Sequence, residues 1–278
     1  MKMSQSEMLT YSTVLIECEY SDGTFGTGTG VIVHLCVDRK TDQCAPVIIT
    51  NRHVVKDSLE IQFEFCLQDE KGHPIDTMPQ RVIYTDVPWI AHPNPDVDLC
   101  CIPLAPVLTQ IPESAKVFYI PLETNLIPSP STLSTLSALE EVVMVGYPIG
   151  LSDRYNHKPI IRRGTTATHV KNNYQGKNDF LVDIACFPGS SGSPILLLNE
   201  GAYTTQHGIS IGSRMMFLGI LYGGTQYTSK GVLSFTNLPN TPTPMLDIPM
   251  NLGVAVKANE ILFFEDIIFQ HFPKPLTT

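Results

Sequence analysis

The feature that most constrains the fold is a long series of short runs rich in β-branched, aromatic and other apolar residues, separated by Gly, Pro, Asn and Asp. Runs of this kind predict strands, and many of them in succession are typical of barrels or sandwiches. The long amphipathic helical segments of a doubly wound sheet are missing between them. We therefore predict an all-β protein. The predicted strands cover residues 13–19, 30–36, 47–50, 59–66, 80–85, 99–104, 116–120, 141–146, 163–170, 180–183, 193–198, 215–222 and 253–256.

One longer helix is predicted near the C-terminal end. Apolar residues recur at spacings of three and four over 260–269, Asn259 can cap the start, and Pro273 ends the pattern. A short helix is expected around 51–56. The segments 127–139 and 225–251 look like insertions, and we expect ordered surface loops because strands follow each of them.

Charge and hydropathy exclude several classes of function. Net charge is −9 and only 16% of residues are charged, which argues against a nucleic-acid partner. The pair Arg162-Arg163 is a tight basic spot in the sequence, but two charges are a weak signal. No apolar run is long enough to span a bilayer, and the first residues lack the apolar region of a signal peptide. We expect a cytoplasmic protein without a membrane partner.

The chain has seven cysteines, an odd number, and no Cys-x-x-Cys pair. Several lie in apolar runs, as Cys100 and Cys101 do, so we expect reduced, buried thiols rather than a disulfide framework. No Cys or His cluster has the spacing of metal ligands, so the sequence predicts no metal site and no cofactor.

Chemistry is indicated first by the run from Phe187 to Pro194, which reads Phe-Pro-Gly-Ser-Ser-Gly-Ser-Pro. A serine nucleophile needs a base, and its acyl-transfer intermediate needs N–H donors aimed at the oxyanion. Gly189 lets the backbone turn, so the amides of Gly189 and Ser191 could form that hole while Ser191 supplies the attacking oxygen. A plain Gly/Ser turn is the alternative for this motif alone.

Two further motifs supply partners for such a serine. His53 follows the apolar run 47–50 after a short turn, where one ring nitrogen could stay free. Asp98 stands directly before the apolar run 99–102 and could accept the Nδ1 proton of an imidazole. Asp96 competes for this role. Taken alone, His53 is better explained as a surface His at a strand end, and the alternative for Asp98 is an Asp that merely ends a turn. The order His, Asp, Ser is much more specific.

With these motifs in place, the sequence resembles the trypsin-like peptidases of the chymotrypsin fold, and among them the bacterial glutamyl-endopeptidase-like and HtrA-like proteases more than digestive trypsins. The resemblance covers roughly 24–269. It rests on Gly-Thr-Gly-Val-Ile-Val at 28–33, Thr-Asn-Arg-His-Val-Val at 50–55, Asp-Leu-Cys-Cys-Ile at 98–102, Val-Gly-Tyr-Pro at 145–148, Arg-Gly at 163–164, the motif ending in Ser191, Leu-Gly-Ile-Leu-Tyr-Gly-Gly at 218–224 and Gly-Val-Ala-Val at 253–256.

The resemblance implies one peptidase unit over 1–278, made of two six-stranded antiparallel β-barrels with the site between them and a C-terminal helix. The N-terminal barrel (10–120) would carry His53 and Asp98, the C-terminal barrel (121–258) would carry Ser191, and the helix would cover 259–271. It also implies a triad of His53, Asp98 and Ser191 that hydrolyses protein or peptide substrates through an acyl-enzyme, with an oxyanion hole at Gly189 and Ser191.

The implied primary specificity pocket contains no charged residue, so we expect a small or apolar P1 side chain rather than Lys or Arg. Glutamyl endopeptidases usually carry a His where this chain has Leu221, which argues against specificity for Glu. The segment 225–251 lies between two strands of the implied pocket. It is either a loop that selects substrates or a surface segment at the rim without a role in selection. The implied pocket residues are Ala185, Cys186, Phe187, Leu221, Tyr222, Gly223 and Gly253.

Trypsins have an Asp just before the nucleophile that pairs with a freed N-terminus, and here that residue is Ser190. We therefore predict no activation of the trypsin type. The alternatives to an active endopeptidase are a protease-fold binding module without turnover, another acyl hydrolase such as an esterase, and a latent protease switched by a partner. No Gly-x-Ser-x-Gly elbow supports an esterase. An activating or inhibitory protein partner remains open.

Overall fold

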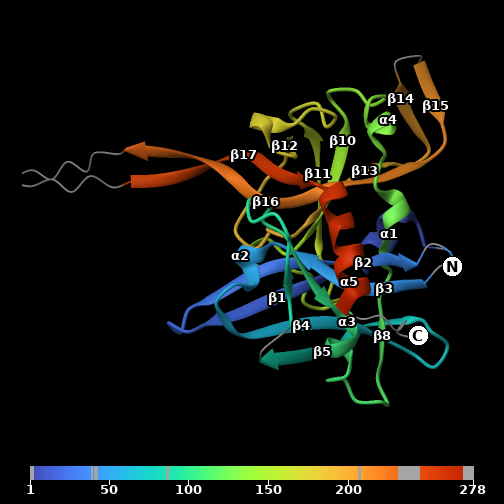
Figure 1. Cartoon of the computed structure of the whole chain (residues 1–278), viewed down its shortest axis with the longest axis vertical. Helices are drawn as coiled ribbons and strands as arrows, with labels where there is room; N and C mark the ends of the chain where they lie inside the picture. Colours follow the sequence, from blue (N-terminus) through green and yellow to red (C-terminus); the bar gives the residue numbers. More distant parts are fainter. Residues whose placement is uncertain are drawn as a thin grey trace, which may run out of the picture.

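A computed structural model of the chain describes residues 3–38, 40, 43–85, 88–205, 208–230 and 245–271. Its elements form two β units, one from each half of the chain, and a C-terminal helix that lies across both in the view of Figure 1. The fold is mostly β, as the sequence predicts.

The N-terminal unit is one sheet with the strand order β5-β4-β1-β2-β3-β7-β6. β8 pairs with β4, and the short β9 runs parallel to β2. Its strands are β1 (Thr13–Tyr20), β2 (Phe25–Asp38), β3 (Gln43–Thr50), β4 (Ser58–Gln68), β5 (Pro74–Thr85), β6 (Ile90–Ala91), β7 (Cys100–Pro103), β8 (Lys116–Phe118) and β9 (Leu122–Glu123). Its helices are α1 (Gln5–Leu9), α2 (Arg52–Val55) and α3 (Leu104–Leu108).

The prediction of a closed six-stranded N-terminal barrel is wrong. The sheet has nine strands and is open, since β5 and β6 at its two ends do not pair within the described residues. Pro88 and Pro93 stand on either side of β6, and proline offers no N–H to a ladder. β6 is therefore only Ile90–Ala91, too short to close the sheet.

The C-terminal unit is a closed six-stranded barrel in the order β10-β11-β12-β17-β16-β13, as expected. Its strands are β10 (Glu141–Gly146), β11 (Ile160–Thr166), β12 (Asp179–Asp183), β13 (Pro194–Asn199), β16 (Arg214–Lys230) and β17 (Met245–Lys257). β14 (Ala202–Thr205) and β15 (Gly208–Ile211) form a separate hairpin. Short helical turns are η1 (Thr124–Leu126), α4 (Pro130–Leu133), η2 (Pro148–Gly150) and η3 (Tyr174–Gly176).

The two predicted insertions have different outcomes. The segment 127–139 contains α4, capped by Ser129, whose hydroxyl accepts a hydrogen bond from the Thr132 amide. The segment 225–251 is not simply a loop, because β16 and β17 continue into it as a two-stranded ribbon that projects from the barrel (Figure 1). The centre of this segment, 231–244, lies outside the described residues.

The core explains how the two units are joined. One apolar cluster fills the N-terminal unit around Ile16, Phe63 and Ile102, and a second fills the barrel around Phe180 and Ile195. A third contains residues of both units and of the C-terminal helix. Each fully buried Ile, Leu or Phe contributes about 1.5–3 kcal/mol, so the third cluster holds the units together.

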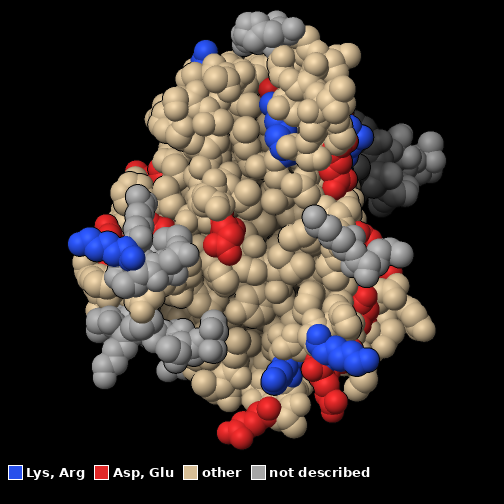
Figure 2. Space-filling view, turned by 90° about the vertical axis from the view of Figure 1, so that its right-hand side faces the viewer, with Lys and Arg blue, Asp and Glu red and all other residues tan. Residues whose placement is uncertain are grey.

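The C-terminal helix consists of η4 (Ala258–Leu262) and α5 (Phe263–His271). Ile261, Phe264 and Ile268 are buried at spacings of three and four, which is the periodicity expected from the sequence. They pack against β2, since the cluster also contains Val31 and Val33. On the face shown in Figure 2, charged side chains are sparse, in keeping with the low charged fraction of the chain.

Candidate active site

The pairing of β3 with β7 brings His53 and Asp98 together. Thr50, the last residue of β3, lies opposite Cys100 of β7, so the chain after Thr50 meets the chain before Cys100. The His53 Nδ1 bonds the Asp98 Oδ2, and the His53 amide donates to the Asp98 Oδ1 at 3.1 Å. The Asn51 side chain donates to the Asp98 carbonyl at 2.8 Å. The imidazole is half exposed, so one ring nitrogen can face a substrate.

Of the two candidate carboxylates, Asp98 is the one hydrogen-bonded to His53. The Asp96 side chain is exposed, and its amide donates to the Asn94 side chain at 3.0 Å in a turn. Burial alone would raise the pKa of Asp98, but the hydrogen bonds and charge of His53 outweigh it and hold that pKa below its usual range. Asp98 is therefore an ionised hydrogen-bond acceptor for His53.

The residues before Ser191 form a tight turn. The Ser190 amide donates to the Phe187 carbonyl at 3.0 Å, Pro188 precedes Gly189, and Gly189 has φ +84°. These are the residue types and the conformation of a type II turn. The Pro188 carbonyl accepts the Ile149 amide at 2.6 Å, so in the trans peptide the Gly189 N–H points the opposite way. That N–H is a candidate donor to an oxyanion.

The residue that bonds this turn has a strained backbone conformation. Ile149, in η2, has φ +54°, a left-handed conformation that β-branched residues rarely adopt. Its amide is nevertheless the donor that holds Pro188. Strain of this kind persists where the surroundings enforce it, often at functional sites.

Ser191 lies where the two units meet. Its carbonyl accepts the Thr29 amide of β2 at 2.8 Å, and the Gly192 amide donates to Leu221 of β16 at 2.8 Å. A Cβ on Gly192 would come within 1.8 Å of the Thr29 carbonyl oxygen and 2.6 Å of the Thr50 hydroxyl, so only glycine fits. Thr50 ends the strand that leads to His53. Within the described residues no hydrogen bond joins His53 to Ser191, a bond that often tightens only with bound substrate.

A cavity of about 170 Å³ opens beside Ser191 and has no charged residue in its lining. That volume is close to the roughly 150 Å³ of an engineered cavity that holds benzene. Of the predicted pocket residues, Cys186, Phe187, Leu221 and Gly223 line it. The complete lining is Cys186, Phe187, Pro188, Ser191, Leu221, Gly223, Gly224 and Thr225.

The other predicted pocket residues lie around the cavity and not in its lining. A Cβ on Gly253 would lie 2.6 Å from the Cys186 sulfur, so Gly253 backs the wall. The Tyr222 hydroxyl donates to Asp179 of β12 at 2.8 Å. The Ala185 carbonyl accepts a hydrogen bond from Arg162. Pro188, Gly224 and Thr225 join the lining without having been predicted.

Arg162 is a site residue that the sequence did not reveal. Besides bonding Ala185, its guanidinium carbon lies 5.1 Å from the centroid of the Phe187 ring. Burial lowers its pKa somewhat. The basic pair seen in the sequence is thus divided, with Arg162 supporting the pocket wall and Arg163 paired with Glu141 on the surface.

Among the described residues, no cluster of three or more His, Cys, Asp or Glu is placed to hold a metal ion. No helix in that part of the chain is long and apolar enough to cross a membrane. The arrangement is one of a hydrogen-bonded His–Asp pair, a serine after a glycine turn, and an uncharged cavity. Such groups can carry out acyl transfer.

Comparison with known families decides the relationship. The profile of the trypsin-like peptidase domain matches residues 28–203, more than half of the chain. The chain belongs to the trypsin-like peptidase domain family. The matched segment contains His53, Asp98 and Ser191. A search of curated protein sequences gives no significant match.

Three of the solved structures that are similar to this chain are the following. The HtrA-type protease AlgW with tripeptide has a TM-score of 0.48 at 13% identity, covering 94% of this chain and 61% of the other. A serine endoprotease from Yersinia pestis has a TM-score of 0.47 at 14% identity, covering 96% and 68%. Rv3671c from M. tuberculosis H37Rv, as an inactive Ser343Ala mutant, has a TM-score of 0.42 at 13% identity, covering 100% and 98%.

Proposed function

We propose that the protein is a serine endopeptidase that cleaves protein substrates through His53, Asp98 and Ser191. The proposal is supported by the hydrogen-bonded His53–Asp98 pair on one unit and by the bond between the Ser191 carbonyl and the Thr29 amide, which joins the serine to that same unit. His53 takes the proton of Ser191 as the serine attacks the carbonyl, and then gives it to the leaving amine. Asp98 orients the imidazole and stabilises its charged form.

In this mechanism the amides of Gly189 and Ser191 hold the oxyanion. The Pro188 carbonyl is already held by Ile149, so the Gly189 N–H is oriented before substrate binds. Donors that are fixed in advance need no reorganisation during the reaction. Water then hydrolyses the acyl-enzyme, again with His53 as the base.

The cavity beside Ser191 supports a preference for a small or apolar P1 residue. Its lining offers no charge to pair with Lys, Arg, Asp or Glu, and burying an unpaired charge is costly. Cys186 does not change this, because burial raises the pKa of its thiol to about 11 and keeps it neutral at physiological pH.

Labelling with a fluorophosphonate probe tests the proposal. The wild type should be labelled on Ser191, as located by peptide mapping, and should cleave a peptide library after small or apolar residues. Ser191→Ala should lose both signals. Ser210→Ala, on the separate hairpin of β14 and β15, is the matched control and should keep both.

A catalytically silent binding module is the second candidate, suggested by the missing hydrogen bond between His53 and Ser191 among the described residues. In that case the wild type would be as unreactive as Ser191→Ala. Labelling that appears only after a protein partner is added would indicate a latent protease.

A further inference from the structure

Ser190 leaves the oxyanion turn without the ion pair that fixes it in trypsins. Its side chain is buried, and among the described residues its hydroxyl accepts a single, long hydrogen bond, 3.5 Å from the Phe187 amide. A hydroxyl at this distance is a weak constraint. The Ile149 amide fixes the Pro188 carbonyl, and a further group is needed to fix the next peptide, between Gly189 and Ser190.

The Thr29 hydroxyl is placed to do this. It lies on β2 of the N-terminal unit and is fully buried. It donates to the Gly189 carbonyl at 3.1 Å and accepts from the Tyr147 amide at 3.1 Å and from the Ser193 hydroxyl at 3.2 Å. A hydroxyl has one donor and two acceptor sites, so all of its capacity is used.

The contacts of Thr29 reach both sides of the turn. Gly189 and Ser193 stand before and after Ser191, and Tyr147 precedes the η2 turn whose Ile149 amide holds Pro188. The main chain of Thr29 adds its own bond to the Ser191 carbonyl, at 2.8 Å. One residue of the N-terminal unit thus contacts Gly189, Ser191 and Ser193.

The packing around this hydroxyl leaves little room for a substitute. A Cβ on Gly189 would lie 2.8 Å from the Thr29 Oγ1, and a Cβ on Gly146 would lie 2.6 Å from it. Both contacts are shorter than real Cβ contacts allow. The backbone at Gly146 and the backbone at Gly189 therefore both pack closely against the Thr29 hydroxyl.

We propose that Thr29 is a positioning residue that holds the Gly189–Ser190 peptide by its carbonyl, and so keeps the turn that presents the Gly189 N–H to the oxyanion, in place of the ion pair of trypsins. This inference rests on the proposed function. If the hydroxyl is removed, the Gly189 carbonyl and the Tyr147 amide lose a buried partner, and the turn loses one of the bonds that orient the Gly189 N–H. Loss of one oxyanion donor lowers kcat by about 10²–10³-fold in well-studied enzymes.

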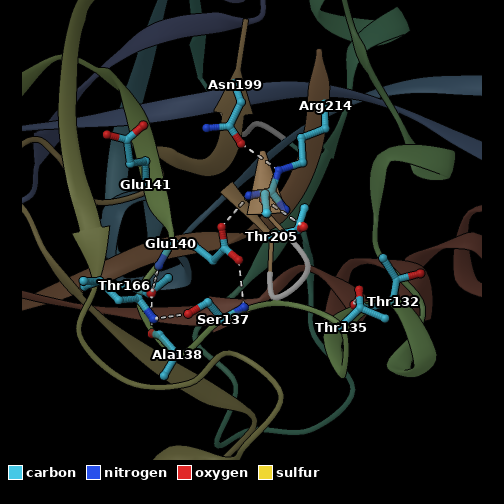
Figure 3. Close-up of polar contacts among 12 residues, drawn as sticks. Thr132, Thr135, Ser137, Ala138, Glu140, Glu141, Thr166, Asn199, Thr205 and Arg214 are labelled. Carbon is cyan, nitrogen blue, oxygen red and sulfur yellow. Dashed lines mark hydrogen bonds and ion pairs between the residues drawn. The ribbon is translucent and has the colours of Figure 1, made fainter. Parts of the chain in front are cut away.

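The test compares Thr29→Val, Thr29→Ser and Thr166→Val in the full-length protein. Valine keeps the shape of threonine without the hydroxyl, and serine restores the hydroxyl. Thr166 is the matched control because its buried hydroxyl also bridges two backbone groups, accepting from the Glu140 amide at 2.9 Å and donating to the Ala138 carbonyl at 2.7 Å. Figure 3 shows these two bonds beside the Glu140–Arg214 ion pair.

Two measurements follow for each variant. The first is kcat and KM for a peptide substrate, with the affinity for a peptide boronate and for the matching peptide carboxamide. The boronate forms a tetrahedral adduct that uses the oxyanion hole, and the carboxamide does not. Thr29→Val should lose about 10–100-fold in kcat and in boronate affinity, with KM and carboxamide affinity changed less than about threefold. Thr29→Ser and Thr166→Val should stay within about threefold of wild type.

The second measurement is hydrogen exchange of the Ile149 and Ser190 amides, which needs no catalysis. Faster exchange of these amides in Thr29→Val than in Thr166→Val supports the proposed role of Thr29. Equal exchange in the two variants, or an intact boronate affinity despite faster exchange, overturns it. If the wild type binds no boronate, the proposed function fails, and the exchange comparison alone decides the role of Thr29.

Discussion

Asp98 holds the imidazole of His53 with both carboxylate oxygens, one on the ring and one on the backbone amide. Asp98→Asn keeps the size of the side chain but replaces the acceptor facing Nδ1, so the wrong tautomer of His53 is favoured. We expect kcat to fall by about 10⁴-fold, the loss seen for the same change in another protease of this kind. Single-turnover kinetics would measure it.

Asp96→Asn is the matched control, because Asp96 is exposed and stands two residues away. It should retain nearly full activity. An active Asp98→Asn together with an inactive Asp96→Asn would contradict the assignment of the acid.

The lowered pKa of Asp98 has a second consequence, for stability at low pH. Its folded pKa lies below the ordinary value of 3.8, so its charged form stabilises the fold. This contribution is complete above the ordinary value and is lost as the pH falls through the lower, folded one. Unfolding measured as a function of pH should therefore show a smaller loss of stability below about pH 4 in Asp98→Asn than in wild type.

At the level of single residues, the sequence can predict candidate site residues that belong to a short, contiguous motif. His53, Asp98 and Ser191 each stand at the end or start of an apolar run, and their order in the chain completes the signal. Arg162 and Thr29 could not be found this way. Arg162 meets Ala185 across 23 positions, and Thr29 meets Gly189 across 160. Only the folded barrel and the contact between the units bring these residues together.

The turn from Phe187 to Ser190 is the smallest element on which the proposed activity depends. Gly189→Ala would place a Cβ 2.6 Å from the Tyr147 carbonyl oxygen and 2.8 Å from the Ile149 amide nitrogen, at a φ of +84°. The turn must then shift, and the Gly189 N–H moves with it. We expect kcat/KM to fall by at least about 10²-fold, measured with the boronate affinity as a second readout.

Gly201→Ala controls for backbone strain alone. Gly201 has φ +94° and has nothing within 4 Å of an added Cβ. A left-handed alanine costs roughly 1–2 kcal/mol of stability there, without an effect on turnover. Equal activity of the two variants would show that the turn does not form the oxyanion hole.

The strands that the sequence analysis did not predict are all short. β6 and β9 have two residues each, and β14 and β15 have four. Segments this short carry too few residues to show an alternating pattern. The same shortness of β6 leaves the N-terminal sheet open. The strands that build the barrel are longer and more apolar, and the sequence placed all six.

The contact between the two units is the feature that belongs to the whole molecule. Besides the shared apolar cluster, the residues before β11 dock on the N-terminal sheet. His157 bonds Glu64 of β4 at 2.8 Å, and the Lys158 ammonium lies 2.6 Å from Asp76 of β5 and 3.3 Å from the centroid of the Tyr11 ring. The Tyr11 hydroxyl also donates to Asp76, at 3.1 Å.

Lys158→Met tests how much this docking contributes. Methionine keeps an unbranched stem but leaves Asp76 partly buried without its cation. We expect the free energy of unfolding in urea to fall by about 1–3 kcal/mol, between the values of exposed and buried ion pairs. Arg163→Met is the control, since its pair with Glu141 is exposed on both sides, and the expected loss is below about 0.5 kcal/mol. Equal losses in the two variants would mean that the Lys158–Asp76 ion pair adds nothing to the contact between the units.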